Sequence, residues 1–188
     1  MLTSYTTIKN MTDPLSPAVF IDRDGTIMQN VDYCSDPRQV KIFAGVPEAL
    51  KRLKSKGFKL IIVTNQSGIG RGLLNVSQYR AVEEEVLRQL GPGLVDATYF
   101  CPDVPGQQST FRKPAPGMIT AATRENEIDL SRSFLIGDKE IDVECGRNAG
   151  VRTIRVRTGC ERDTNGSMAD WIVDDLPAAV DRILNETP

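Results

Sequence analysis

The sequence contains no histidine. This absence excludes Ser-His-Asp triads, histidine nucleophiles and zinc sites with histidine ligands, because each of them needs an imidazole group. The chain has 25 acidic and 23 basic residues. Carboxylates and lysine must therefore carry any chemistry.

Cysteine is also scarce. The four cysteines form no Cys-x-x-Cys pair, which argues against a structural zinc site or a redox motif; they are Cys34, Cys101, Cys145 and Cys160. None is followed six positions later by arginine, so the loop of a cysteine-dependent phosphatase is absent. We expect reduced, mostly buried cysteines and no cysteine nucleophile.

Long apolar runs and an excess of one charge are missing as well. The longest strongly apolar run, residues 59–63, is far below the roughly 20 residues of a membrane helix. Residues 1–10 lack the apolar centre of a secretory signal. The net charge of −2 predicts no nucleic-acid partner. We expect a cytoplasmic protein with no membrane partner, and no feature indicates its oligomeric state.

The 188 residues, 40% of them apolar, fit one globular domain. The expected strands are 18–22, 58–64, 97–101, 133–138, 152–157 and 171–173, and the expected helices are 46–56, 77–90, 116–126, 142–149 and a last one ending at Asn185. Such alternation predicts an α/β fold whose mostly parallel sheet has helices on both faces. We divide the chain into an N-terminal extension, residues 1–17, and a single domain, residues 18–188.

Three of the expected strands end in polar residues. The first ends in Asp22, with Asp24 two residues later, the second ends in Thr64 and Asn65, and a later one ends in Asp138. Ligands of open parallel sheets bind at the carboxyl ends of the strands, so these residues are expected to meet at one edge. Alternatively, Asp22 and Asp24 are only turn-forming residues before a glycine.

The residue types suit phosphoryl transfer. A phosphate monoester is a dianion that repels nucleophiles, so its hydrolysis needs neutralising charge. A metal shared by Asp22, Asp138 and a backbone carbonyl near Asp24 would supply it, and oxygen ligands suit Mg²⁺. Lys113 would add a positive charge and Thr64 a hydroxyl donor. The pattern indicates Mg²⁺-dependent chemistry on a phosphate.

Four segments together resemble the motifs of haloacid dehalogenase-like phosphatases: residues 22–26, 64–65, 113–114 and 137–142. The resemblance spans roughly residues 18–160. Within that superfamily, residues 64–72 and 112–118 are similar to the D-glycero-D-manno-heptose 1,7-bisphosphate phosphatases and the related histidinol-phosphate phosphatases. It implies a three-layer Rossmann-like fold.

The resemblance also implies a two-step mechanism with an aspartyl-phosphate intermediate. Asp22 would be the nucleophile, and Asp24 would protonate the leaving group and then activate water. The implied catalytic residues are Asp22, Asp24, Thr64 and Lys113, and the implied metal ligands are Asp22, Asp24 and Asp138. Asp142 would hold a coordinated water or orient Lys113, unless it is only a carboxylate at a helix N-terminus.

Substrate contacts are expected from Asn65, Arg71 and Arg112. The guanidinium of Arg112 can bind a second phosphate or a sugar hydroxyl. The glycine-rich residues 68–72 are interpreted as a flexible loop that closes over substrate, with Arg71 near its tip. Their Gly-x-Gly-x-Gly spacing does not fit a dinucleotide site.

The sequence departs from the family in one loop. Many heptose bisphosphate phosphatases bind zinc there with three cysteines and a histidine, but this chain has only Cys101, and Asp103 stands at the histidine position. We therefore expect no zinc. About 40 residues separate Asp24 from Thr64, and about 48 separate Thr64 from Lys113. These gaps leave no room for a separate cap domain, so we expect an open site.

The leading interpretation is a Mg²⁺-dependent phosphatase that acts on a small phosphorylated metabolite, a sugar bisphosphate, at position 7 of heptose 1,7-bisphosphate. Histidinol-phosphate phosphatase is the first alternative. A non-catalytic phosphosugar-binding protein is the second, and it is disfavoured because no motif carboxylate or lysine has been lost.

Overall fold

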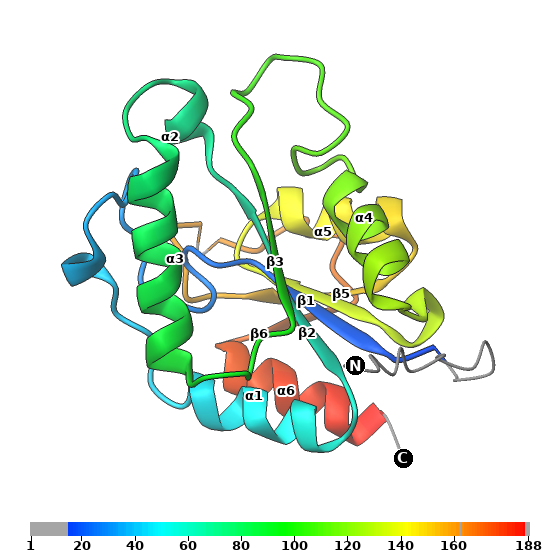
Figure 1. The fold of residues 1–188 in the computed structure, drawn as a ribbon. Coiled ribbons are helices and arrows are strands. Elements are labelled where there is room, and N and C mark those ends of the chain that lie inside the picture. Colours follow the sequence, from blue (N-terminus) through cyan, green and yellow to red (C-terminus); the bar gives the residue numbers. More distant parts are fainter. Residues whose placement is uncertain (1–14, 162, 187–188) are drawn as a thin grey trace, which may run out of the picture.

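The structure, a computed structural model, describes residues 15–161 and 163–186. Its centre is one parallel sheet with the strand order β3-β2-β1-β4-β5-β6 (Figure 1). The strands are β1 (Ala18–Ile21), β2 (Lys59–Asn65), β3 (Ala97–Cys101), β4 (Phe134–Gly137), β5 (Arg152–Val156) and β6 (Trp171–Val173). The first strand is central because Val19 pairs with both Leu60 and Phe134. The expected parallel α/β sheet is confirmed.

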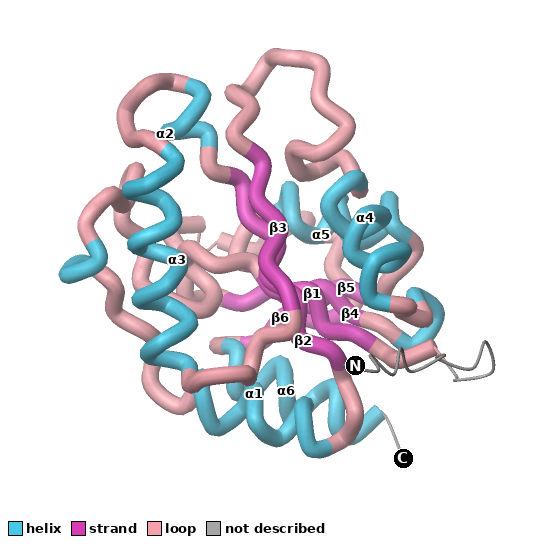
Figure 2. The backbone as a smooth tube through the Cα atoms, viewed as in Figure 1, coloured by secondary structure: helices cyan, strands magenta, loops and turns pink. Residues whose placement is uncertain are grey.

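Helices cover both faces of the sheet (Figures 1 and 2). One face packs against α1 (Val46–Ser55), α3 (Val76–Leu90) and α6 (Leu176–Glu186), and the other against α4 (Gly117–Asn126) and α5 (Glu140–Ala149). Successive strand side chains point to opposite faces. Val19 and Ile21 therefore belong to the first core, whereas Ala18 and Phe20 belong to the second. The three-layer architecture is confirmed.

The local sequence explains where the first helix lies. In α1, Val46, Ala49, Leu50 and Leu53 occupy one stripe at helical spacing, and all four are buried. Burying such a stripe against a sheet is the main source of helix stability in a globular protein. Gly57, with a φ of 82°, turns the chain in a conformation that other residues rarely adopt, and β2 begins two residues later.

One short helix replaces an expected flexible loop. Residues Ser67–Gly70 form α2, a single helical turn. A Cβ atom at Gly68 would overlap Leu74 and Tyr33, and one at Gly70 would overlap the carbonyl of Pro102. The glycines at 68 and 70 therefore permit close packing, and the prediction of a flexible loop over residues 68–72 was wrong for this turn. Two 3₁₀ turns complete the described elements, at Pro37–Gln39 and Leu130–Arg132.

The start of the described chain is tied to the domain. The amide of Ser16 donates to the carbonyl of Glu127 at 3.1 Å, and the carbonyl of Pro17 accepts from Lys59 at 2.9 Å. The rest of the predicted N-terminal extension, residues 1–14, lies outside the described residues. The division into residues 1–17 and 18–188 stays a prediction.

The cysteines behave as their pattern predicts. Three of them are buried, Cys160 is exposed, and all are free thiols. Within residues 15–161 and 163–186, no helix is both long and apolar enough to cross a membrane.

Candidate functional site

The candidate site lies where β1, β2 and β4 end. Asp22 follows β1, Thr64 is near the end of β2, and Asp138 follows β4. Carboxylate oxygens of Asp22, Asp138 and Asp142 all lie within 4.8 Å of one another, and all three residues are buried. The expected meeting of the strand ends is confirmed for Asp22 and Asp138.

Lys113 lies at the centre of this cluster. Its ammonium group donates to Asp22 at 2.6 Å and to the carbonyl of Val63 at 3.0 Å, and it forms an ion pair with Oδ1 of Asp142 at 2.6 Å. Only 3% of Lys113 is exposed. Ion pairs between buried groups are held apart from water, so their geometry is fixed by the fold. Asp22 therefore carries a positive partner on one of its two oxygens.

Asp142 both contacts Lys113 and lies at a helix N-terminus, which the sequence left as alternatives. Its Oδ2 accepts from the amide of Lys139 at 3.1 Å, which caps the start of α5. Its Oδ1 contacts the ammonium of Lys113. One carboxylate thus stabilises the helix N-terminus and orients the lysine.

Asp138 differs from the other two carboxylates, because neither of its oxygens has a hydrogen-bond partner among the described residues. Both of its side-chain oxygens are buried and accept no hydrogen bond there. Gly25 and Gly159 border the carboxylate so closely that a Cβ at either position would overlap it. Buried orphan carboxylate oxygens next to a second carboxylate, that of Asp22, fit a hard divalent cation.

Burial shifts the ionisation of these groups. Desolvation raises the pKa of Asp22 to about 6, although Lys113 opposes the shift. Desolvation, with repulsion from Asp22 and Asp142, raises the pKa of Asp138 to about 8. Burial alone would lower the pKa of Lys113, but Asp142 and Asp22 outweigh it and raise that pKa. Lys139 and Lys113 both oppose the shift at Asp138, but they do not cancel it.

The raised pKa values of Asp22 and Asp138 predict a pH dependence of stability. Unfolded Asp has a pKa near 3.9, so between about pH 4 and pH 8 the folded state keeps protons that the unfolded chain has released. Stability must therefore fall as the pH rises. Without metal, we expect the melting temperature to drop by about 5–10 °C between pH 5.5 and pH 8. Thermal unfolding in EDTA measures this, and an unchanged or higher melting temperature at pH 8 would contradict it.

Added Mg²⁺ supplies the control for that experiment. A cation that binds only the folded protein raises stability, and it competes with protons for the carboxylates. The Mg²⁺-induced rise in melting temperature should therefore be larger at pH 8 than at pH 5.5.

Asp24 is not part of the cluster of Asp22, Asp138 and Asp142. Both of its oxygens accept from the Nε and Nη2 atoms of Arg23 at 2.9–3.2 Å, and its Oδ2 accepts from the Gln66 amide at 2.8 Å. This leaves its main-chain carbonyl, rather than its carboxylate, for the predicted metal contact. One fifth of the side chain is exposed, so the carboxylate remains open to a pocket.

That pocket, with a volume of about 270 Å³, is the expected place for substrate. It is lined by Arg23, Asp24, residues 30–34, residues 65–68 and Lys139. Sequence reasoning missed Asn30, Tyr33 and Gln66 as lining residues. For Gln66 the sequence does hold a signal, because it is a polar residue directly after a strand.

The three predicted substrate contacts differ in placement. Asn65 lines the pocket, but its amide also exchanges two hydrogen bonds with the backbone of Lys113, at 3.1 and 3.2 Å. Arg112 donates to the carbonyl of Asp103 at 2.9 Å, and the side chain of Arg71 is exposed at the end of α2. Their proposed contacts with substrate stay predictions, and Asn65 has in addition a structural task in positioning Lys113.

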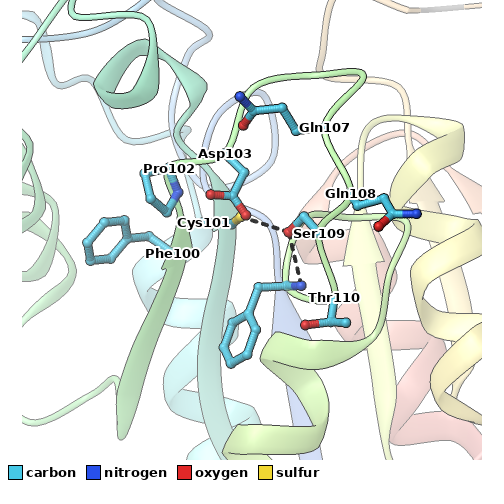
Figure 3. Close-up of a pocket in the computed structure, with 9 residues that line it drawn as sticks. Phe100, Cys101, Pro102, Asp103, Gln107, Gln108, Ser109 and Thr110 are labelled. Atoms are coloured by element: carbon cyan, nitrogen blue, oxygen red, sulfur yellow. Dashed lines mark hydrogen bonds between the residues drawn. The ribbon is translucent and has the colours of Figure 1, made fainter.

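The loop that departs from the zinc-binding pattern is organised by a hydroxyl. Ser109 Oγ lies 3.8 Å from the sulfur of Cys101 and accepts from the amide of Phe111 at 3.2 Å (Figure 3). It also accepts from the amide of Arg112 at 2.9 Å. The absence of zinc stays a prediction, because the hydrogen bonds show only how this loop is held in its place.

Three comparisons place the chain among known proteins. A profile of the HAD-hydrolase-like family matches residues 110–179. The D-glycero-D-manno-heptose-1,7-bisphosphate 7-phosphatase of Thermosynechococcus vestitus is 37% identical over 89% of this chain and 95% of its own. The D-glycero-beta-D-manno-heptose-1,7-bisphosphate 7-phosphatase of Helicobacter pylori J99 is 41% identical over 82% of this chain and 96% of its own.

A crystal structure agrees with these sequences. The D,D-heptose 1,7-bisphosphate phosphatase from B. bronchiseptica, complexed with magnesium and phosphate, has a TM-score of 0.84 and 30% identity. The match covers 91% of this chain and 99% of that one. This chain therefore belongs to the haloacid dehalogenase-like phosphatases, in the family of the heptose bisphosphate phosphatases.

Proposed function

We propose that this protein removes the 7-phosphate of D-glycero-D-manno-heptose 1,7-bisphosphate with the help of Mg²⁺. The observation that carries the chemistry is the buried contact of 2.6 Å between Asp22 and Lys113, next to the unpartnered carboxylate of Asp138. The choice of substrate is supported by the names of the relatives that match most of the chain.

The residues of the site fit a two-step reaction. Lys113 contacts Oδ1 of Asp22, and the other oxygen attacks the phosphorus atom. The bond from phosphorus to the sugar oxygen breaks, and Asp24 gives that oxygen a proton. Asp24 then takes a proton from a water molecule, whose oxygen attacks the phosphorus of the aspartyl-phosphate and releases Asp22 and phosphate.

The metal would be held by Asp22, Asp138 and the main-chain carbonyl of Asp24. When bound, Mg²⁺ would neutralise charge on the phosphoryl oxygens and so allow a carboxylate to approach them. Lys113 supplies a second positive charge next to Asp22, and Thr64 supplies a hydroxyl donor.

The pocket beside Asp24 suits a sugar as the leaving group. Its lining includes the side chains of Asn30, Asp32, Ser67 and Lys139, all of which can hydrogen-bond to hydroxyl groups. The exposed ring of Tyr33 adds an apolar surface at the rim. Such a mixture recognises a polyhydroxylated compound better than an apolar one.

The test is phosphate release with Mg²⁺ from heptose 1,7-bisphosphate, histidinol phosphate and an aryl phosphate. We expect the heptose substrate to have the highest kcat/KM, and Asp22→Asn to lower its turnover by at least about 10⁴-fold, because the nucleophile is lost. Asp181→Asn, an exposed change in an ion pair on α6, is the control and should stay within twofold of the wild type.

Each other result has a distinct meaning. A preference above tenfold for histidinol phosphate would replace the proposed substrate. Activity that survives Asp22→Asn would remove the aspartyl-phosphate mechanism. Binding of the heptose substrate without turnover, in protein loaded with Mg²⁺, would indicate a phosphosugar-binding protein.

A further inference from the structure

Gln66 is buried between two residues of the proposed reaction, Asp24 and Thr64, but it takes no part in the chemical steps themselves. Its side-chain nitrogen lies 2.8 Å from Oδ2 of Asp24 and 2.8 Å from the hydroxyl oxygen of Thr64. An ionised carboxylate can only accept hydrogen bonds, so the amide edge facing Asp24 must be the nitrogen. Both hydrogens of that nitrogen are thereby used, one toward each partner.

The backbone holds Gln66 firmly in this place. Gln66 comes directly after β2. Its main-chain N–H donates to the carbonyl of Cys101, at the end of β3, at 2.7 Å. Only 7% of the residue is exposed. The side chain therefore projects from the sheet edge toward Asp24 and Thr64 with little freedom to move.

We propose that Gln66 is a positioning residue that fixes the acid–base carboxylate and the phosphate-binding hydroxyl with one amide group; this inference rests on the two-step mechanism of the proposed function. Toward Asp24, it sets the direction of Oδ2. Toward Thr64, it sets the direction in which the hydroxyl can donate.

The effect on Thr64 follows from hydrogen-bond counting. A hydroxyl group has one hydrogen and accepts through its lone pairs. Because the oxygen of Thr64 accepts from Gln66, its own hydrogen is left to donate elsewhere. A phosphoryl oxygen bound beside Lys113 then meets a hydroxyl that is already turned to donate, and no reorganisation is needed during the reaction.

Arg23 is the counterpart of Gln66 on the other side of Asp24. Its guanidinium binds both oxygens of the carboxylate and lies 5.5 Å from the ring centre of the buried Tyr79. Arg23 is 2% exposed. The carboxylate of Asp24 is thus fixed by Arg23 and by Gln66, and Gln66 connects it to Thr64 on the phosphate-binding side of the site.

Substrates with different leaving groups distinguish a misplaced Asp24 carboxylate from a general disturbance of the structure. An alkoxide leaves from phosphorus with difficulty unless it receives a proton, whereas p-nitrophenolate leaves without one. Misplacing the acid therefore slows alkyl phosphates much more than p-nitrophenyl phosphate. For the aryl substrate, kcat/KM reports only the steps up to formation of the aspartyl-phosphate, so the later use of Asp24 as a base does not enter.

The experiment compares kcat/KM for glycerol 1-phosphate and p-nitrophenyl phosphate with saturating Mg²⁺. Gln66→Met keeps a side chain of similar length without hydrogen-bond donors. Gln66→Glu keeps the shape but presents only acceptors to Asp24 and Thr64. The matched control is Gln89→Met, because the amide of Gln89 also makes two bonds, to Glu85 and to the carbonyl of Val40, but on α3, outside the site.

We expect Gln66→Met to lower kcat/KM about 100-fold for the alkyl phosphate and about tenfold for the aryl phosphate. Gln66→Glu should lower both by more, since its charge repels Asp24 and its oxygens draw the proton of Thr64. Gln89→Met should change neither by more than twofold.

Equal losses on both substrates, or a loss below threefold on the alkyl phosphate, would overturn the proposal. Thermal unfolding shows whether each variant is folded, and if Gln66→Met does not fold, the ratio for Gln66→Glu decides. The alkyl-to-aryl ratio does not depend on which sugar phosphate is the natural substrate, so an error in that assignment leaves this test intact.

Discussion

Lys113→Met is expected to lower the free energy of unfolding of the metal-free protein by about 3–5 kcal/mol at pH 7.5. The ammonium group lies 2.6 Å from both Asp22 and Asp142, and all three residues are buried. Methionine retains most of the apolar stem, so the loss is mainly electrostatic. Two buried carboxylates are left without their counter-charge, which is the costly way to break a buried ion pair.

Urea unfolding at two pH values measures this effect and its cause. The pKa of Asp22 is already raised to about 6 and should rise further without the lysine. At pH 5, protonation then removes one of the two charges, so the loss should be clearly smaller than at pH 7.5. A loss that does not depend on pH would mean that Lys113 acts through packing.

Lys51→Met is the matched control for that substitution. Lys51 lies on α1, is 61% exposed at its side chain and is 3.7 Å from Glu48. Exposed pairs of this kind contribute less than about 1 kcal/mol. Phosphatase activity should be unchanged in this variant, whereas Lys113→Met should also lose activity because the charge beside Asp22 is gone.

Most of the fold could be predicted because its signals are local. Apolar runs such as Leu60–Val63 give buried strands, and the stripe of Val46, Leu50 and Leu53 gives a helix face. The short helix α2 could not be predicted this way. Its sequence, Ser-Gly-Ile-Gly, has low helix propensity, and it is held by the close packing of Gly68 against Leu74 and Tyr33.

The site, like the fold, was predictable only where its signals are local in the sequence. Asp22 and Asp138 could be brought together from the sequence, because parallel strands place their carboxyl ends at one edge. The direction of the Asp24 carboxylate could not. It depends on the turn at Gly25, where φ is 88°, and on an ion pair with its own neighbour Arg23.

Asp138→Asn is the second substitution with a large expected effect, and it should change stability and activity in opposite directions. The carboxylate of Asp138 is fully buried, accepts no hydrogen bond from the described residues and has a pKa raised to about 8 by burial and by the repulsion of Asp22 and Asp142. Asparagine has the same shape and no charge. At pH 8.5 the metal-free variant should gain about 1–2 kcal/mol of stability.

The same change should destroy the metal-dependent function. Asparagine is a weaker ligand for a hard divalent cation than a carboxylate. We expect turnover to fall by at least about 100-fold, and the stabilisation by Mg²⁺ to disappear. Isothermal titration with Mg²⁺ and thermal unfolding in EDTA measure binding and stability without relying on activity.

Asp142→Asn tests whether the gain belongs to Asp138 or to any loss of negative charge in the cluster. The carboxylate of Asp142 contacts Lys113 and accepts from the amide of Lys139, so its neutralisation removes favourable contacts and should destabilise the metal-free protein. If both variants become less stable at pH 8.5, Asp138 is not an unfavourable charge in the folded protein. If they shift in opposite directions, the unpartnered carboxylate is retained at the expense of stability because binding a cation requires it.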